Sequence, residues 1–203
     1  MSQIALPLER AGKAAPSRIV LGPANAHVAD AISDPSNWPF GTAILLGPPR
    51  SGKSLMGSWF VQQGFGTTID GADAMDETAL FHRWNRAREG GERLLLIVDR
   101  ESWDITLPDL RSRLGAALQL EIGAPDDAML AALIEEHAAM RGLALGEEAT
   151  RYLVPRMARS FAGAEKIVAG IDRISLERKS PPSLAVWRAA LEAVEGPEAP
   201  RLL

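Results

Sequence analysis

The sequence has 203 residues, no cysteine and a formal net charge of −4, with 22 Lys and Arg against 26 Asp and Glu. This length is typical of one medium domain, or of one domain with a small companion. The absence of cysteine excludes disulfide bonds and thiol chemistry, and it suits a cytoplasmic protein. The acidic balance argues against broad nucleic-acid binding, which depends on clustered cations.

Signals for a membrane span or a histidine-based metal site are missing from the sequence. It has no apolar run of about 18 residues, as a membrane helix requires, and no signal-peptide pattern. His27, His82 and His137 are far apart in the chain and lack metal-ligand spacing. We therefore expect no membrane partner and no metal ion held by histidines.

The chain begins with a short apolar peptide formed by Gln3, Ile4, Ala5, Leu6, Pro7 and Leu8. It lies within residues 1–20, which we expect to be a flexible tail. An apolar peptide near a chain end either packs onto its own domain or docks into a groove of a partner. A first helix is predicted over residues 25–32, shortly after Pro23.

Residues 43–62 contain the most specific motif of the chain. An apolar run over residues 43–46 is typical of a buried parallel strand, and residues 55–62 can continue as a helix. Between them the G-x-x-x-x-G-K-[ST] pattern is matched by Gly47, Pro48, Pro49, Arg50, Ser51, Gly52, Lys53 and Ser54. The glycines allow a tight turn around phosphate, and the loop N–H groups face the anion. Lys53 can reach the β- and γ-phosphates, and Ser54 can hold Mg²⁺.

The next candidate for the magnesium site is Asp70, which ends the β-branched run Thr67-Thr68-Ile69. A fold of this type needs an acid at the end of a nearby strand to hold the water shell of the metal ion. Asp70 has that position, and the alternative is that it is a simple turn residue. Gly71 stands where a second acid is usual, so we expect weak or no intrinsic ATP hydrolysis.

Helix and strand signals then alternate up to residue 122. Helices are predicted over residues 78–89 and 107–114, and strands over residues 94–98 and 118–122. Asp99 and Arg100 follow the apolar strand directly, and polar groups there lie over the ligand crevice in open α/β sheets. Arg111 and Arg113 of the short helix are either functional or part of a solvated basic face.

From Pro125 the composition becomes helical, with helices predicted over residues 126–141, 147–154, 161–178 and 183–194. We therefore predict an α/β fold, with a P-loop domain built on a parallel sheet and followed by a small all-α domain; the resemblance described below implies that the sheet is shortened and that the helical domain is a lid. The predicted divisions are the tail at 1–20, the α/β domain at 21–123, the lid at 124–196 and a second tail at 197–203.

Three stretches of this chain resemble the Hda family of DnaA-related AAA+ proteins. Thr106 to Leu114 is similar to the arginine-finger segment, and Asp99-Arg100 is similar to the sensor-1 end of the preceding strand. The peptide from Gln3 to Leu8 resembles the sliding-clamp-binding peptide at the start of Hda proteins. The α/β domain with a helical lid also has the AAA+ layout, and Asn25-Ala26 resembles the first helix of that family near the adenine.

The resemblance implies a role for each of these groups. ADP or ATP with Mg²⁺ would be bound by Asn25 and by the loop residues Gly47, Pro48, Pro49, Arg50, Ser51, Gly52, Lys53, Ser54 and Leu55, with Ser54 and Asp70 at the metal ion. Asp99 would be the sensor, and Arg113 would be the finger that acts on ATP held by DnaA, limiting initiation of replication. Gln3, Ile4, Leu6, Pro7 and Leu8 would bind the β subunit clamp, so that DNA is met only through the clamp.

This chain also departs from that family pattern in three ways. The interval between Ser54 and Asp70 is too short for the further strand and helix that relatives carry there, so we expect a four-stranded sheet. The second acid is missing at Gly71. The sensor-2 arginine of the lid is not identified, and the candidates for it are Arg159, Lys166 and Arg173.

Two other functions fit the same motifs. The chain could be an AAA+ ATPase of DNA replication whose homo-oligomeric ring places Arg113 between identical subunits. It could also be a nucleotide-binding adaptor in which Arg111 and Arg113 contact only solvent or the lid. The sequence leaves the oligomeric state and the choice between ADP and ATP open.

Overall fold

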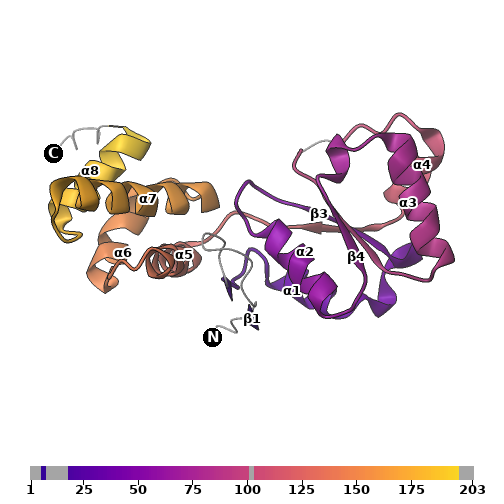
Figure 1. The fold of residues 1–203 in the computed structure, drawn as a ribbon, viewed down its shortest axis with the longest axis horizontal. Coiled ribbons are helices and arrows are strands. Elements are labelled where there is room, and N and C mark those ends of the chain that lie inside the picture. The colour runs from indigo at the N-terminus through magenta and orange to yellow at the C-terminus, as the bar shows by residue number, and fades with distance from the viewer. Residues whose placement is uncertain (1–5, 8–17, 101–102, 197–203) are drawn as a thin grey trace. The chain divides into compact units, whose positions relative to one another are not determined.

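A computed structural model describes residues 6–7, 18–100 and 103–196 of the chain, which divides into two compact units. One unit spans Pro23–Gly123, and the other combines the described parts of residues 1–22 and 124–203 (Figure 1). The α/β unit contains α1 (Ala26–Ser33), β3 (Thr42–Leu46), α2 (Lys53–Gln62), β4 (Thr67–Asp70), α3 (Glu77–Glu89), β5 (Leu94–Ile97), α4 (Pro108–Gly115) and β6 (Leu118–Glu121), with short 3-10 turns η1 (Pro35–Asn37), η2 (Pro39–Gly41) and η3 (Ala72–Ala74).

Four parallel strands form the sheet of the α/β unit in the order β4-β5-β3-β6. Ile44 of β3 is paired with Leu96 of β5 on one side and with Gln119 of β6 on the other. Because β3 has a neighbour on both sides, the loop that leaves it lies over the middle of the sheet. The predicted four-stranded parallel sheet is confirmed.

The two faces of this sheet are covered by different helices. Ile44, Leu94 and Leu96 share a buried cluster with Leu80 of α3 and Leu110 of α4. On the opposite face α2 packs closely, since a Cβ on Gly57 would lie 2.8 Å from Cδ1 of Ile97. Successive side chains of a strand point to opposite faces, which is why neighbouring residues of β5 enter different layers. The loop helix α2 and the arginine helix α4 therefore lie on opposite sides of the sheet.

The second unit is helical. It contains α5 (Asp127–Met140), α6 (Glu147–Leu153), the 3-10 turn η4 (Val154–Arg156), α7 (Phe161–Arg178) and α8 (Leu184–Glu195). Leu130, Ile134, Ile167 and Ile171 are fully buried in its core. None of the helices in the described part of the chain is long and apolar enough to cross a membrane.

The second unit also contains a two-stranded antiparallel sheet that the sequence did not predict. β1 (Leu6–Pro7) pairs with β2 (Arg18–Ile19), with Leu6 opposite Ile19 and Pro7 opposite Arg18. Ile19 is buried. Leu6 and Pro7 of the predicted clamp peptide are therefore strand residues, while Gln3, Ile4 and Leu8 lie outside the described residues.

Candidate functional site

The loop between β3 and α2 needs glycine at two positions. A Cβ on Gly47 would lie 2.8 Å from Cβ of Ile122, so a larger residue there would displace the end of β6. Gly52 has a φ of 90°, a left-handed conformation that other residues rarely adopt. Gly52 is also the residue before α2, so the first N–H groups of that helix open directly onto the loop. Such groups can bind an anion.

Lys53 turns its ammonium group back into this loop. Nζ donates to the carbonyl oxygens of Gly47 at 2.8 Å and Pro48 at 3.3 Å, and it lies 3.2 Å from Oδ1 of Asp99. The Lys53 side chain is buried, whereas the Asp99 side chain is 71% exposed. The cation is therefore held in the loop by two carbonyl oxygens and one exposed carboxylate, and phosphate oxygens can replace them without leaving Asp99 buried and unpaired.

Ser51 supplies an unused donor to the same loop. Its side chain is buried, and Oγ has no hydrogen-bond partner among the described residues. Oγ lies 3.3 Å from the point where a Cβ on Gly47 would stand, so it is directed into the loop. A buried polar group without a partner costs about 1–3 kcal/mol. A phosphate oxygen in the loop would accept this hydrogen bond, and the donors present therefore fit a phosphate group.

Ser54 and Asp70, the predicted magnesium residues, both lie at the carboxyl edge of the parallel sheet. Ser54 is in the first turn of α2 and Asp70 ends β4, and both are exposed. The described residues contain no group of three or more His, Cys, Asp or Glu side chains that could hold a metal ion. The residues present therefore fit a Mg²⁺ ion most of whose ligands are phosphate oxygens and water molecules, which is the usual arrangement at such sites.

Asp73 is a site residue that the sequence analysis missed. It is buried, and its carboxylate accepts hydrogen bonds from the backbone N–H groups of Asp99 and Arg100, both at 3.2 Å. Nε of Arg100 lies 3.6 Å from the same carboxylate. Gly71, at a φ of 69°, allows the 3-10 turn that brings Asp73 to this position. Asp73 thereby fixes the segment that carries Asp99, the partner of Lys53.

Asn25 stands at the start of α1 and is buried, with 1% of its surface exposed. Its carbonyl oxygen accepts from the N–H of Ala29, and the preceding carbonyl, that of Ala24, accepts from the N–H of Gly123 at 3.0 Å. The beginning of α1 is therefore tied to the chain just after β6. This arrangement fixes the position of Asn25 but does not assign it a ligand.

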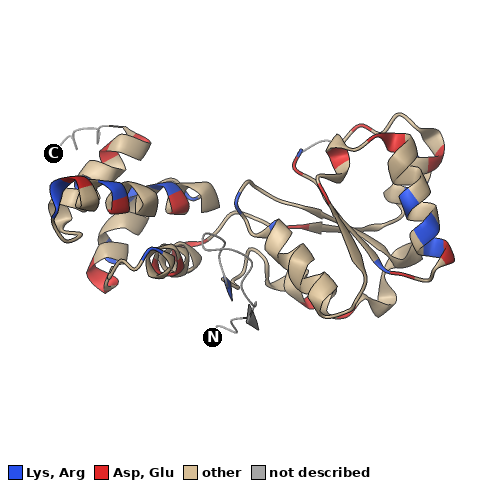
Figure 2. Cartoon of the chain, viewed as in Figure 1, with Lys and Arg blue, Asp and Glu red and all other residues tan. Residues whose placement is uncertain are grey.

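Arg113 of α4 lies against α3, a helix that itself carries basic residues (Figure 2). Its Cζ is 4.6 Å from the ring centroid of Trp84 and 5.0 Å from that of Phe81, and Nη1 donates to Oδ1 of Asn85 at 3.2 Å. Flat contacts of this kind, with one hydrogen bond, hold a guanidinium in one orientation while leaving most of its donors available.

Arg111, two residues earlier, has a different environment. Its Nε donates to the carbonyl oxygen of Ile105 at 2.6 Å, and Nη2 lies 3.5 Å from Oδ1 of Asp104. These bonds tie Arg111 to the segment just before its own helix. The two arginines of α4 are therefore distinguishable, and Arg111 is a matched control for substitutions of Arg113.

Glu77 holds the start of α4, which is a second feature that the sequence analysis missed. Its carboxylate accepts from the N–H of Thr106 at 2.9 Å, the Thr106 hydroxyl at 2.7 Å and the N–H of Leu107 at 2.7 Å. Leu107 is the residue before α4 and has no capping side chain of its own. The backbone and hydroxyl hydrogen bonds from Thr106 and the bond from Leu107 lower the pKa of Glu77 below its usual value.

This shift predicts a pH-dependent contribution of Glu77 to stability. A carboxylate whose pKa is lower in the folded state stabilises it above the unfolded pKa and loses that effect as the pH falls through the folded pKa. We expect Glu77→Gln to lower Tm near neutral pH, with the difference from the unmodified chain shrinking as the pH falls below 4.5. Thermal unfolding followed by circular dichroism measures this. Glu92→Gln is the control, and a Tm difference that does not change with pH contradicts the assignment.

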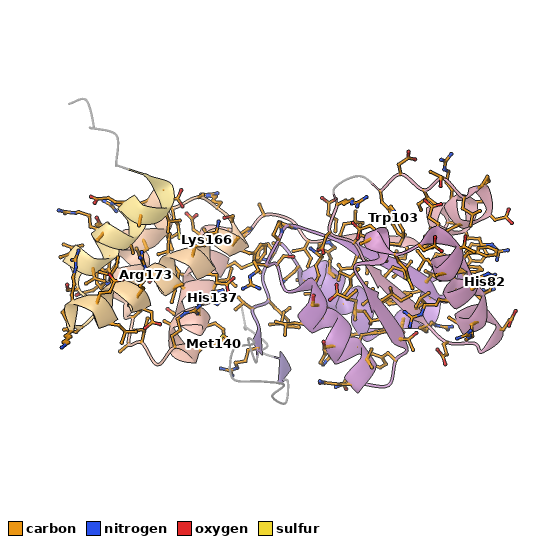
Figure 3. All side chains as sticks on the ribbon, turned by 45° about the horizontal axis from the view of Figure 1, so that its top comes forward. His82, Trp103, His137, Met140, Lys166 and Arg173 are labelled. Atoms are coloured by element: carbon orange, nitrogen blue, oxygen red, sulfur yellow. The ribbon has the colours of Figure 1, made fainter. Side chains whose placement is uncertain are left out.

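The three candidates for the lid arginine lie on the helical unit. Arg159 is paired with Asp127 at 2.9 Å, and Arg173 lies 3.8 Å from Glu177 one turn further along α7. Lys166 and Arg173 are both on α7 and exposed (Figure 3). All three side chains are accessible, and their local contacts do not select one of them as sensor-2.

The parallel P-loop sheet, with its helical companion unit, defines a chain of the AAA+ fold. It is similar to domain III of Thermotoga maritima DnaA, with a TM-score of 0.71 and 14% identity over 87% of this chain and 95% of that one. It is also similar to AMPPCP-bound DnaA from Aquifex aeolicus, with a TM-score of 0.58 and 17% identity over 79% and 67% of the two chains. The AAA domain of FIGL-1 in complex with ADP gives a TM-score of 0.64 and 14% identity over 95% and 87%.

Residues 126–181, which include α5, α6 and α7, match the family model described as Hda, lid domain. The match confirms the resemblance to the Hda family. A relative from Haemophilus influenzae, described as an uncharacterized protein, is 30% identical over 104 residues. That alignment covers 50% of this chain and 45% of the relative, so the chain spans less than half of that protein.

Proposed function

We propose that this chain is a regulator of the replication initiator DnaA that stimulates hydrolysis of DnaA-bound ATP through Arg113. The observation that carries the proposal is the placement of Arg113. Its helix packs on the face of the sheet opposite to α2, and its guanidinium is held against Trp84 and Asn85 instead of its own loop. An arginine placed there suits a phosphate of another protein better than one bound by its own chain.

The proposed chemistry is stabilisation of charge on the transferring phosphoryl group. An arginine supplied by a second protein accelerates hydrolysis by about 10³–10⁵-fold in other P-loop systems. Guanidinium suits this role because it stays charged and can bind two phosphate oxygens at once. Trp84 and Asn85 hold Arg113 in one orientation before the complex forms, which lowers the entropy lost when it engages the phosphate.

A nucleotide bound in the loop of this chain, ADP or ATP with Mg²⁺, has a structural part in the proposal. Gly47, Ser51, Gly52 and Lys53 would hold its phosphates, with Ser54 and Asp70 contacting the hydrated metal ion. Mg²⁺ would neutralise phosphate charge there. Gly71 stands at the usual place of the second acid. The nearby carboxylate of Asp73 already accepts hydrogen bonds from two backbone N–H groups and does not replace that acid. We therefore expect slow turnover by the chain alone.

Docking on the sliding clamp, the second part of the proposal, depends on the peptide from Gln3 to Leu8. The support for it is the sequence of that peptide, in which the apolar residues Ile4, Leu6 and Leu8 lie close together. We expect Leu6→Ala with Leu8→Ala to weaken clamp binding by about tenfold or more, because apolar anchors carry most of the energy of short-peptide recognition. Surface plasmon resonance with immobilised clamp measures this.

The control for the peptide is Leu184→Ala, which removes an exposed apolar side chain from α8. This control should bind the clamp as the unmodified chain does. Unchanged clamp affinity of the double variant, together with a lower Tm, would show that the peptide is a packed part of its own unit.

The proposed function as a whole is tested by hydrolysis of ATP bound to DnaA. DnaA loaded with radiolabelled ATP is mixed with clamp on primed DNA, with and without this chain. The proposal predicts that conversion to ADP accelerates only when the chain and the clamp are both present. If ADP forms equally fast with and without this chain, the chain is a nucleotide-binding adaptor and not an activator of hydrolysis.

A further inference from the structure

The guanidinium of Arg113 is the end of a longer stack of aromatic rings and arginines. Cζ of Arg88 lies 5.7 Å from the ring centroids of both Phe40 and Trp84, and Trp84 in turn contacts Arg113 at 4.6 Å. Phe40 is thereby connected to Arg113 through two intermediate side chains. We name Phe40, Arg88, Trp84 and Arg113 the arginine–aromatic stack.

Phe40 has two unfavourable properties in the isolated chain. Its backbone is in the left-handed region, at φ 52° and ψ 22°, which is rare for a residue with a bulky side chain. The residue is also 51% exposed. Strained residues of this kind cluster at functional sites, where their surroundings maintain the conformation. The strained backbone presents a large apolar ring to solvent. This ring contributes binding energy only when a second surface covers it.

A hollow of about 550 Å³ adjoins this stack. It is lined by Phe40, Trp84, Asn85, Arg88, Glu89, Ser112, Arg113 and Ala116. Its walls carry two guanidinium groups against one carboxylate, and neither Arg88 nor Arg113 forms an ion pair within the described residues. The hollow therefore combines an apolar ring with an excess of positive charge, which complements an acidic side chain next to an apolar one.

We propose that this hollow is the docking site for the surface of DnaA beside its bound ATP, with Phe40 and Arg88 as the recognition residues. This inference rests on the proposed function. If Arg113 reaches a phosphate of DnaA, the surface around that phosphate must cover the hollow that Arg113 borders. The segment that docks presents an acidic side chain to Arg88 and an apolar group to Phe40.

The division of roles follows from chemistry. Aromatic and arginine side chains dominate the binding energy of protein interfaces when a partner excludes water from them. Phe40 and Arg88 therefore determine how tightly DnaA binds, whereas Arg113 determines how fast its ATP is hydrolysed. A substitution of Phe40 or Arg88 raises the concentration of this chain needed for half-maximal stimulation and leaves the saturating rate unchanged.

Stimulated hydrolysis, measured as a function of the concentration of this chain, tests the inference. Phe40→Gly and Arg88→Ala are each expected to raise the half-saturating concentration about tenfold. Glycine tolerates the left-handed backbone, so Phe40→Gly should keep or raise Tm while it weakens docking. Val61→Ala and Arg86→Ala are matched controls, since Val61 is a similarly exposed apolar residue on α2 and Arg86 is an exposed arginine of α3 that does not line the hollow.

The outcomes separate this inference from the proposed function. If Phe40→Gly and Arg88→Ala leave the half-saturating concentration unchanged, the hollow is not the docking site. If Arg113→Ala still lowers the rate in that case, the proposed role of Arg113 stands. Full stimulation by Arg113→Ala overturns the proposed function itself. Sedimentation of the chain alone gives the last test, because self-association that Phe40→Gly abolishes would make a second copy the occupant and overturn the assignment to DnaA.

Discussion

Arg113→Ala is expected to reduce stimulated hydrolysis of DnaA-bound ATP by about 10³-fold or more, the effect of removing a trans-acting arginine in other P-loop systems. The affinity for ADP and for the clamp should be unchanged, because the contacts of Arg113 within the described residues are to Phe81, Trp84 and Asn85 of α3 and not to the loop around Lys53. Single-turnover conversion of labelled ATP on DnaA, at saturating clamp and saturating chain, measures the loss.

Two further variants sharpen this prediction. Arg113→Lys keeps a positive charge but cannot form the two-pronged contact with phosphate oxygens, so it should restore little of the rate. Arg111→Ala should keep most of the rate, because Arg111 is bonded to the carbonyl of Ile105 and to Asp104 within its own segment. If Arg111→Ala and Arg113→Ala reduce the rate equally, the effect comes from damage to α4 and not from a specific finger.

Lys53→Met is expected to weaken ADP binding by about a hundredfold, since removing one partner of a buried charged contact costs about 2–5 kcal/mol. The fold should persist, because Asp99 is largely exposed and the carbonyls of Gly47 and Pro48 can bind water instead. Isothermal titration calorimetry gives the affinity. Lys179→Met is the control, since Lys179 is an exposed lysine just after α7.

The Lys53→Met variant also tests whether nucleotide binding in the loop and stimulation of DnaA by Arg113 are separable. If Lys53→Met binds ADP as well as the control does, the loop does not use its cation and the pocket must lie elsewhere. If Lys53→Met loses ADP and also loses stimulation of DnaA, bound nucleotide is required to organise the regulator. Arg113→Ala, which should keep ADP, then provides the complementary case.

The fold was predictable because its signals are local. The apolar run that ends at Val98 specifies a strand buried on both faces, and the glycines of the loop specify the turn from β3 to α2. Asp126 accepts from the N–H of Met129 at 2.8 Å and starts α5 as its position in the sequence suggests. The short interval before Asp70 likewise predicted the missing strand, since too few residues remain to form one.

The missed parts of the site depend on contacts between distant residues. Asp73 contacts the backbone of residues 99 and 100 only because Gly71 turns the chain, and no local pattern distinguishes it from a surface acid. Glu77 is adjacent to Asp76, which caps α3, but the carboxylate of Glu77 accepts from Thr106, 29 positions further along the chain. The stacking of Arg113 on Trp84 required two helices to be placed side by side, which periodicity alone cannot predict.

The most direct test of the central claim is a label swap between the two proteins. DnaA carrying γ-labelled ATP is mixed with clamp on DNA and with this chain bound to unlabelled ADP, and the reciprocal mixture places the labelled ATP on this chain. Acceleration by a trans-acting Arg113 predicts rapid release of labelled phosphate from the first mixture and slow release from the second. Rapid release from the second mixture alone would contradict the account and identify the chain as an ATPase in its own right.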